Sequence, residues 1–152
     1  MGETLRKIID KNLKEAMKSG ERTRLSVLRM LTAAICNKEI QLLKKDQGLS
    51  DDEVLEVIRS EVKKRRDASE EFRKGNRPEL AENENKEMEI LSGYLPPELS
   101  DAELERILKE GIREAGAKGK SEFGRVMKIS MPVLRGKASG ERISRILNRL
   151  LE

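Results

Sequence analysis

Apolar residues recur along the chain at the three- and four-residue spacing of amphipathic helices. Seven segments follow this spacing, and nowhere does the sequence show the strict alternation of a half-buried strand. The pattern therefore predicts an all-α, multihelical fold, with four helices followed by three shorter ones. The apolar segments span residues 5–17, 25–36, 54–72, 80–95, 104–112, 123–134 and 143–150.

Residues that start and stop helices divide this chain into two parts. Ser50 with Glu53, and Ser100 with Glu103, have the spacing of capping boxes, so we expect a helix to begin at each serine. Pro96-Pro97 precedes the second box, and two prolines cannot continue a helix. The predicted subdomains are residues 1–95, with four helices, and residues 96–152, with three.

The second apolar segment differs from the others. From Leu25 to Cys36, nine of twelve residues are apolar, and at 100° per residue they cover the whole helical wheel. Such a helix has no face to spare for solvent. We therefore expect it in the middle of a helical bundle.

Composition excludes several classes of chemistry. The chain has no His, which excludes His-based nucleophile activation, proton shuttling and His-ligated metal sites. Its one cysteine, Cys36, excludes an internal disulfide and a CxxC site, and we expect an inert core thiol there. The sequence therefore favours a protein that is not an enzyme and that needs no metal or cofactor.

The N-terminal sequence has no apolar core of the kind found in signal peptides, and no apolar run approaches the ~20 residues of a membrane span. A single cysteine is typical of a reducing compartment. We expect a cytoplasmic protein that does not cross a membrane.

The most obvious basic run is Lys63-Lys64-Arg65-Arg66. Four consecutive helical residues spread over about 300° of the wheel, so they do not form one patch. Glu61 and Arg65 also have the spacing of an ordinary surface ion pair. We interpret this run as a solvated helix face.

Positive charge is concentrated in the last quarter of the chain. Residues 116–152 contain nine Lys and Arg against three Asp and Glu, whereas the first 115 residues contain 23 against 25. This imbalance favours contact with an anionic partner such as RNA. The basic residues are Lys118, Lys120, Arg125, Lys128, Arg135, Lys137, Arg142, Arg145 and Arg149.

A glycine-rich turn, residues 134–140, lies between the last two predicted helices. Its glycines, Gly136 and Gly140, precede a helix N-terminus, where free N–H groups and the helix dipole favour phosphate. The alternative is a plain helix–helix turn whose glycines serve only its backbone angles. Only three aromatic residues exist, so any RNA contact should use phosphate, sugar and shape rather than base stacking.

Several motifs together resemble the YqeY family. In the C-terminal half they are Leu95-Pro96-Pro97-Glu98-Leu99-Ser100, Phe123-Gly124-Arg125-Val126-Met127, Met131-Pro132 and Arg135-Gly136-Lys137-Ala138 with Gly140. In the N-terminal half they are Glu21-Arg22, Leu25-Ser26-Val27-Leu28-Arg29-Met30, Glu71-Phe72 and Gly75-Asn76-Arg77. The resemblance spans nearly the whole chain.

Over their C-terminal helices, YqeY proteins are similar to the tail domain of the B subunit of the glutamine-dependent aminoacyl-tRNA amidotransferase. The resemblance implies a multihelical fold with two subdomains and a tail-like part that touches tRNA. It also implies packing roles for Gly124, Val126 and Met127, and places Arg135, Gly136, Lys137 and Gly140 in a turn that could face RNA. The amidotransferase's catalytic domains have no counterpart in this sequence.

The leading hypothesis is a non-catalytic tRNA-binding or tRNA-associated accessory protein. One alternative is a protein-interaction module with a groove between its two helical parts. The other is carbon–nitrogen ligase activity with glutamine as amido donor, which rests on family association alone. The predicted RNA-contacting residues are Lys120, Arg125, Lys128, Arg135, Gly136, Lys137, Gly140, Arg142, Arg145 and Arg149.

Overall fold

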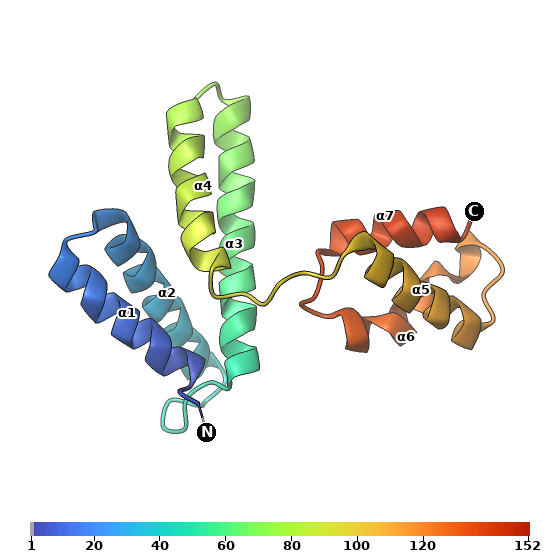
Figure 1. The fold of residues 1–152 in the computed structure, drawn as a ribbon, viewed down its shortest axis with the longest axis horizontal. Helices are drawn as coiled ribbons and strands as arrows, with labels where there is room; N and C mark the ends of the chain where they lie inside the picture. The colour runs from blue at the N-terminus through green and yellow to red at the C-terminus, as the bar shows by residue number, and fades with distance from the viewer. Residues whose placement is uncertain (1) are drawn as a thin grey trace. The chain divides into compact units, whose positions relative to one another are not determined.

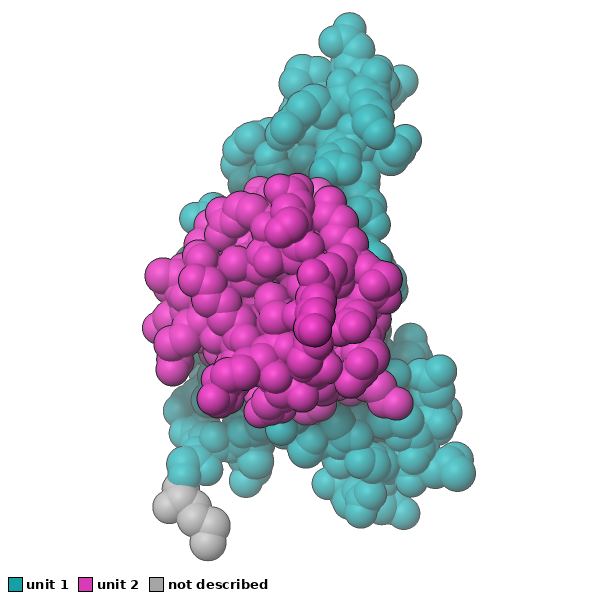
Figure 2. Space-filling view, turned by 90° about the vertical axis from the view of Figure 1, so that its right-hand side faces the viewer, with its two compact units in different colours: residues 1–95 teal, residues 96–152 magenta. Residues whose placement is uncertain are grey.

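The computed structural model describes residues 2–152. In this part of the chain there are seven α-helices, one short 3-10 helix and no strand (Figure 1), so the all-α prediction is confirmed. The chain divides into two compact units, residues 1–95 and residues 96–152 (Figure 2). We call them unit 1 and unit 2 and describe each by itself.

Unit 1 consists of two helical hairpins (Figure 1). Helix α1 (Leu5–Ser19) pairs with α2 (Arg22–Gln41), and α3 (Asp51–Lys74) pairs with α4 (Pro78–Ser92). Helix α2 also packs against α3 and α4, which joins the hairpins. The capping box predicted at the start of α3 is present, because Ser50 Oγ accepts from the Glu53 N–H and Glu53 Oε1 accepts from the Ser50 N–H.

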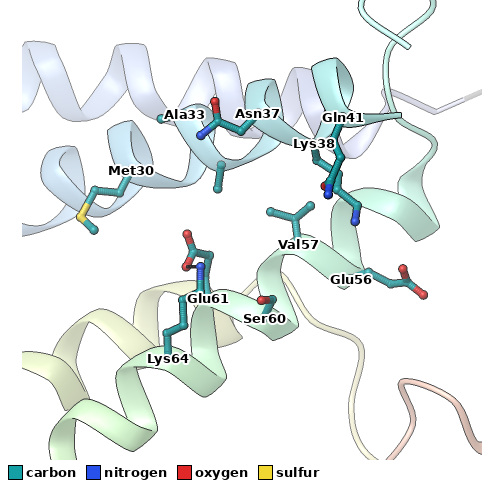
Figure 3. Close-up of a pocket in the computed structure, with 11 residues that line it drawn as sticks. Met30, Ala33, Asn37, Lys38, Gln41, Glu56, Val57, Ser60, Glu61 and Lys64 are labelled. Atoms are coloured by element: carbon teal, nitrogen blue, oxygen red, sulfur yellow. Dashed lines mark ion pairs between the residues drawn. The ribbon is translucent and has the colours of Figure 1, made fainter. Parts of the chain in front are cut away.

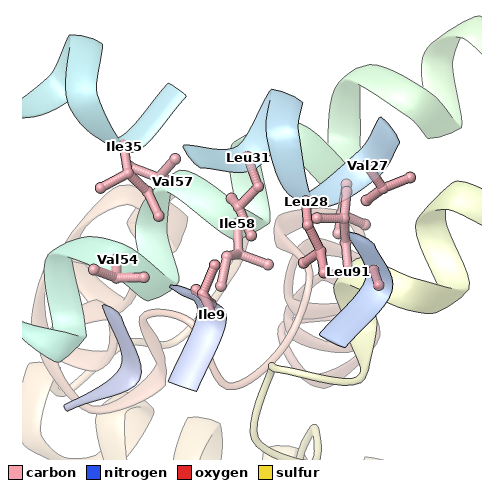
Figure 4. Close-up of a cluster of buried hydrophobic side chains, with 11 residues drawn as sticks. Ile9, Val27, Leu28, Leu31, Ile35, Val54, Val57, Ile58 and Leu91 are labelled. Carbon is pink, nitrogen blue, oxygen red and sulfur yellow. The ribbon is translucent and has the colours of Figure 1, made fainter. Parts of the chain in front are cut away.

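Aliphatic side chains from all four helices make the core of unit 1 (Figure 4). Full burial of each such side chain stabilises the fold by roughly 1.5–3 kcal/mol. No aromatic residue belongs to the fully buried set of unit 1. The largest fully buried side chains of unit 1 are Ile9, Val27, Leu28, Leu31, Ile35, Ile58 and Leu91.

Helix α2 occupies the central place that its sequence predicts, in contact with α1, α3 and α4. The expectation that it has no solvent face is wrong, because Met30 is 49% exposed and Ala33 is exposed as well. Cys36 is half-buried rather than in the core, and its Sγ accepts a hydrogen bond from Arg6 Nη2 at 3.7 Å. Part of the surface of α2 thus faces solvent.

The basic run of α3 corrects a second expectation. Arg65 is buried and makes a network between three helices, so this part of the run is not a solvated face. Its Nη1 donates to the backbone oxygen and to Oε2 of Glu61, and its Nε donates to Glu87 Oε2 of α4 at 3.2 Å. Its Nη2 donates to Met30 Sδ of α2 at 3.5 Å. The Glu61–Arg65 pair exists as predicted, but inside the protein.

Unit 2 is a three-helix unit with a core of its own. Helix α5 (Asp101–Ala115) packs against α6 (Phe123–Leu134) and α7 (Gly140–Leu150), and a 3-10 helix, η1 (Lys120–Glu122), precedes α6. Helices α5 and α6 approach so closely at Gly111 that a Cβ there would collide with Ser130 Oγ. The fully buried side chains of this core are Leu104, Leu108, Val126, Leu134, Ile143 and Leu147.

Candidate nucleic-acid interface

The glycine-rich turn and the segment after the prolines lie together in unit 2. Gly136 has a φ of +77°, a left-handed conformation that glycine adopts without strain. The Leu99 N–H donates to the Lys137 carbonyl oxygen at 2.8 Å. The Ser139 side chain caps α7 by accepting from the Arg142 N–H at 3.2 Å. Two motifs that are 40 residues apart in sequence therefore form one local structure.

Arg142 connects α7 to the start of α5. Its guanidinium donates to Glu98 Oε2 at 2.8 Å, to Asp101 Oδ1 at 2.7 Å and to the Leu99 carbonyl oxygen at 2.8 Å. The hydrogen bond from Arg142 holds the pKa of the Asp101 carboxyl below its usual value. We call Arg142 with Glu98, Leu99 and Asp101 the α5–α7 clamp.

The other two arginines of α7 lie on the same side. Arg149 Nη2 donates to Glu105 Oε2 of α5 at 3.2 Å. Arg145 lies near enough to Asp101 for its charge to contribute to the lowered pKa of that carboxyl. The structure thus brings the three predicted α7 arginines together, against acidic residues of α5.

A second group of predicted residues lies outside this acidic network. Arg125, Lys128 and Lys137 are exposed, and within residues 2–152 their side chains form no ion pair and no hydrogen bond. Arg125 and Lys128 follow each other by one turn of α6. We call these three residues the exposed cations.

The remaining predicted residues have mixed environments. Lys120 Nζ lies 3.6 Å from Glu152 Oε1, and Arg135 is exposed and engaged within the protein. A Cβ on Gly140 would meet nothing within 4 Å, so this glycine leaves open space at the start of α7. Gly124 is also exposed with nothing near it, which contradicts its implied packing role, whereas Val126 is fully buried.

The acidic partners of the α7 arginines are what sequence reasoning missed. The prediction counted charge over residues 116–152, but unit 2 as a whole holds twelve Lys and Arg against nine Asp and Glu. The capping box that begins α5 already signalled acids at that helix start. Only the packing of α7 on α5 could reveal that those acids pair with the arginines.

This surface offers cations and the backbone N–H groups at the start of α7. Among residues 2–152 there is no cluster of three or more His, Cys, Asp or Glu side chains that could hold a metal ion. No helix in the same range is long and apolar enough to span a membrane. What these groups can do chemically is neutralise phosphates and hydrogen-bond to them.

A comparison with protein families matches residues 6–151 to the family described as Yqey-like protein. The match covers nearly the whole chain. The chain therefore belongs to the YqeY family.

Several curated relatives carry the name "Altered inheritance of mitochondria protein 41, mitochondrial", among them the following three. The protein from Pyrenophora tritici-repentis is 29% identical over 84% of this chain and 69% of its own length. That from Lachancea thermotolerans is 36% identical over 64% of this chain and 52% of its own length. That from Clavispora lusitaniae is 33% identical over 70% of this chain and 61% of its own length. The chain thus spans between half and about two thirds of these relatives.

The names of these relatives correct one expectation. The sequence features led us to expect a cytoplasmic protein, whereas the relatives are named as mitochondrial proteins. The prediction of a cytoplasmic location is therefore wrong.

Proposed function

We propose that this member of the YqeY family is a non-catalytic tRNA-binding or tRNA-associated accessory protein that contacts RNA through unit 2. The observation that carries the proposal is the group of exposed cations, Arg125, Lys128 and Lys137. These side chains have no acidic partner within residues 2–152. Their charge is therefore available to an external anion.

The second support is the resemblance of the C-terminal motifs to the amidotransferase tail domain. That resemblance includes Arg125 in the Phe123–Met127 motif and Lys137 in the glycine-rich turn. The same stretches of sequence thus carry both the exposed charge and the likeness to a tRNA-binding protein.

The mode of binding follows from the residues at hand. Exposed Lys and Arg neutralise backbone phosphates, and such contacts carry little sequence information. Phe123 and Tyr94 are half-buried and offer no stacking platform. We therefore expect recognition of RNA shape and backbone, with Arg142 and Arg149 serving mainly to hold α7 on α5.

Filter binding of tRNA across a salt series tests the proposal. If four phosphates are neutralised, the log of the binding constant should fall with the log of the salt concentration with a slope of about −3 to −3.5. The double variant Arg125→Glu/Lys128→Glu should weaken binding and reduce that slope by about 1.5 to 2. Arg142 is left intact, because reversing its charge would break the α5–α7 clamp and confuse lost binding with lost structure.

The matched control is Arg106→Glu/Lys109→Glu on α5. This variant changes the net charge of unit 2 by the same amount at two exposed positions. It should bind tRNA more tightly than the α6 variant. Equal affinity of the two variants would show that the site is misplaced, and no binding by the wild type at low salt would show that the function is wrong.

A further inference from the structure

Four lysines share one side of α1. They follow one another at steps of four, three and four residues, so they fall within about 60° of the helical wheel. This side lies opposite Ile9 and Ala16, which are fully buried in the core of unit 1, and all four lysines are exposed. The row is about 16 Å long. We call these residues the α1 lysine row: Lys7, Lys11, Lys14 and Lys18.

The two acidic residues of α1 lie beside the row and not on it. Asp10 Oδ1 lies 3.4 Å from Arg6 Nε, and Glu15 Oε2 lies 3.9 Å from Arg24 Nη2 of α2. Both carboxylates are thus paired with arginines, which leaves the lysines without an acid from their own helix.

Most of the row has no acidic partner elsewhere either. Within residues 2–152 the side chains of Lys7, Lys14 and Lys18 form no ion pair and no hydrogen bond. Lys11 Nζ lies 3.4 Å from Glu3 Oε1, and these side chains are 64% and 53% exposed. Such an exposed pair contributes little and is easily exchanged for another anion. Helix α1 contains five Lys and Arg against two Asp and Glu, whereas the rest of unit 1 contains 15 against 17.

On α3, basic residues are mixed with acids. Arg59, Lys63 and Arg66 also fall within about 60° of the helical wheel. Asp52 and Glu70 lie on that same side of the helix. The basic residues of α3 therefore do not form a row of one sign.

The open cleft of about 570 Å³ between α2 and α3 shows the same mixture (Figure 3). Lys38 and Lys64 line it together with Glu56 and Glu61. Lys64 Nζ lies 3.6 Å from Glu61 Oε2. Interspersed charges of both signs are what solubility requires of a surface. The α1 lysine row departs from this arrangement and so points to an anionic ligand.

The chemistry of the row selects the class of ligand. A helix that binds a membrane inserts its apolar side into the lipid, but the apolar side of α1 is packed in the core of unit 1. Protein interfaces are depleted in lysine and rely on aromatic and arginine side chains, none of which lies in this row. Basic residues along one face of a helix are typical of nucleic-acid binding.

We propose that the α1 lysine row contacts the phosphates of an RNA backbone. The inference deepens the function proposed above and rests on it, because the ligand is the same tRNA. It assigns RNA contact to unit 1, whereas all the RNA-contacting residues predicted from sequence lie in unit 2. A nucleic-acid strand carries a phosphate about every 3.4 Å of helix axis in B-DNA, so a row of this length faces several phosphates. Lysine contacts of this kind add affinity without sequence specificity.

Filter binding of tRNA to the full chain across a salt series tests the row. Three or four added phosphate contacts should make the wild-type slope steeper, by about 2 to 3.5, than the value of about −3 to −3.5 expected for unit 2 alone. Lys11→Gln/Lys14→Gln removes two charges, and glutamine has about the same helix propensity as lysine. We expect this variant to bind about tenfold more weakly at about 50 mM salt, with a slope that is flatter by about 1.5.

The matched control is Lys63→Gln/Arg66→Gln on α3. It removes two charges at the same spacing from exposed positions of the same unit. Because acids share that side of α3, this variant should keep the affinity and the slope of the wild type. Circular dichroism of both variants confirms that their helices form. An equal loss of affinity in the two variants overturns the assignment of the row.

Protection of lysine amines gives a test that needs no variant. The wild type is acetylated with and without tRNA, and the modified lysines are read by mass spectrometry. All four lysines of the row should be protected by tRNA. Lys63 and Lys86, which are exposed on α3 and α4, should react equally under both conditions. Equal reaction of the row with and without tRNA overturns the inference.

The unit 2 variant separates this inference from the proposed function. If Arg125→Glu/Lys128→Glu weakens tRNA binding and Lys11→Gln/Lys14→Gln does not, the row is wrong and the interface in unit 2 stands. The reverse result leaves the row in place and shows that the site in unit 2 is wrong. No tRNA binding by the wild type at low salt overturns both. Binding to vesicles that contain phosphatidylserine, lost in the α1 variant while tRNA binding is kept, overturns RNA as the ligand of the row.

Discussion

Arg65 of unit 1 and Arg142 of unit 2 make similar sets of contacts in different surroundings. Each guanidinium joins separate helices through two carboxylates and one backbone carbonyl. The Arg65 side chain is 6% exposed, whereas that of Arg142 is 25% exposed and its carboxylate partners are more than half exposed. The difference between the two sites is therefore access to water.

This comparison shows how little a basic sequence run says about function. One arginine comes from a run that we interpreted as solvated surface, and the other from a segment that we predicted to bind RNA. Both are used internally. A cation is available to a partner only when the packed structure leaves its head group without acids, as with Arg125 and Lys128.

Loss of Arg65 should have the largest effect. Arg65→Ala leaves Glu87 without its cation and leaves Glu61 with only the exposed Lys64, whose Nζ lies 3.6 Å from Glu61 Oε2. Because both carboxylates are mostly buried, we expect unit 1 to lose about 3 kcal/mol. Hydrogen exchange of peptides from α2, α3 and α4 measures the loss within the full chain. Arg66→Ala, at the exposed neighbouring position, should change protection by less than about 0.5 kcal/mol. If the two variants behaved alike, the Arg65 network would contribute nothing to stability.

Loss of Arg142 should have a smaller effect, confined to unit 2. Arg142→Ala removes three hydrogen bonds whose acceptors can turn to water, so we expect the melting temperature of unit 2 to fall by about 5 °C. Calorimetry of the full chain measures it. Arg145→Ala serves as control, because within residues 2–152 no ion pair is found for Arg145. An unchanged melting temperature for Arg142→Ala would mean that the α5–α7 clamp is only a surface feature.

High salt should change the stability losses of the two arginine variants by different amounts. At 1 M salt the screening length is about 3 Å, so exposed ion pairs weaken while buried ones are screened much less. The melting penalty of Arg142→Ala should shrink in 1 M NaCl, and the penalty of Arg65→Ala should persist. Melting of both variants and the wild type at low and high salt measures this. A parallel decline of both penalties would remove the distinction between the sites.

The smallest expected effect is on the titration of Asp101. Because Arg142 lowers the pKa of this carboxyl in the folded state, Asp101 contributes stability above its ordinary pKa of 3.8, and that contribution is lost as pH falls through the lower folded value. Arg142→Ala should move the Asp101 pKa back up toward 3.8. Carboxyl-carbon NMR across an acid titration follows the shift. An Asp101 pKa that is the same in both proteins would contradict the α5–α7 clamp.

Local features of the fold were predictable from sequence because they depend on neighbouring residues. The capping boxes at Ser50 and Ser100 form as their spacing predicts. The fourth helix ends at Ser92, earlier than the predicted Leu95, because Gly93 and the approaching prolines weaken its last turn. The sixth helix ends at Leu134, as its predicted segment does, although Pro132 lies inside it. Such errors of a few residues are typical of helix ends.

Tertiary features were not predictable in the same way. The burial of Arg65 depends on Met30 and Glu87, which lie 35 and 22 residues away in sequence. The exposure of Met30 and Ala33 depends on how α2 packs against its neighbours, which hydrophobic periodicity does not report. The sites of RNA contact stay a prediction, because charge counts along a segment do not show which charges meet across helices.

The backbone bond between Leu99 and Lys137 has a practical consequence for dissecting the molecule. Leu99 precedes α5, yet its N–H and its carbonyl oxygen are both bound by the C-terminal helices and their turn. A fragment that starts at Ser100 would keep all three helices of unit 2 and still lose the contacts that fasten the glycine-rich turn. A fragment that keeps these contacts of unit 2 therefore begins at Pro96 and includes the residues that precede α5.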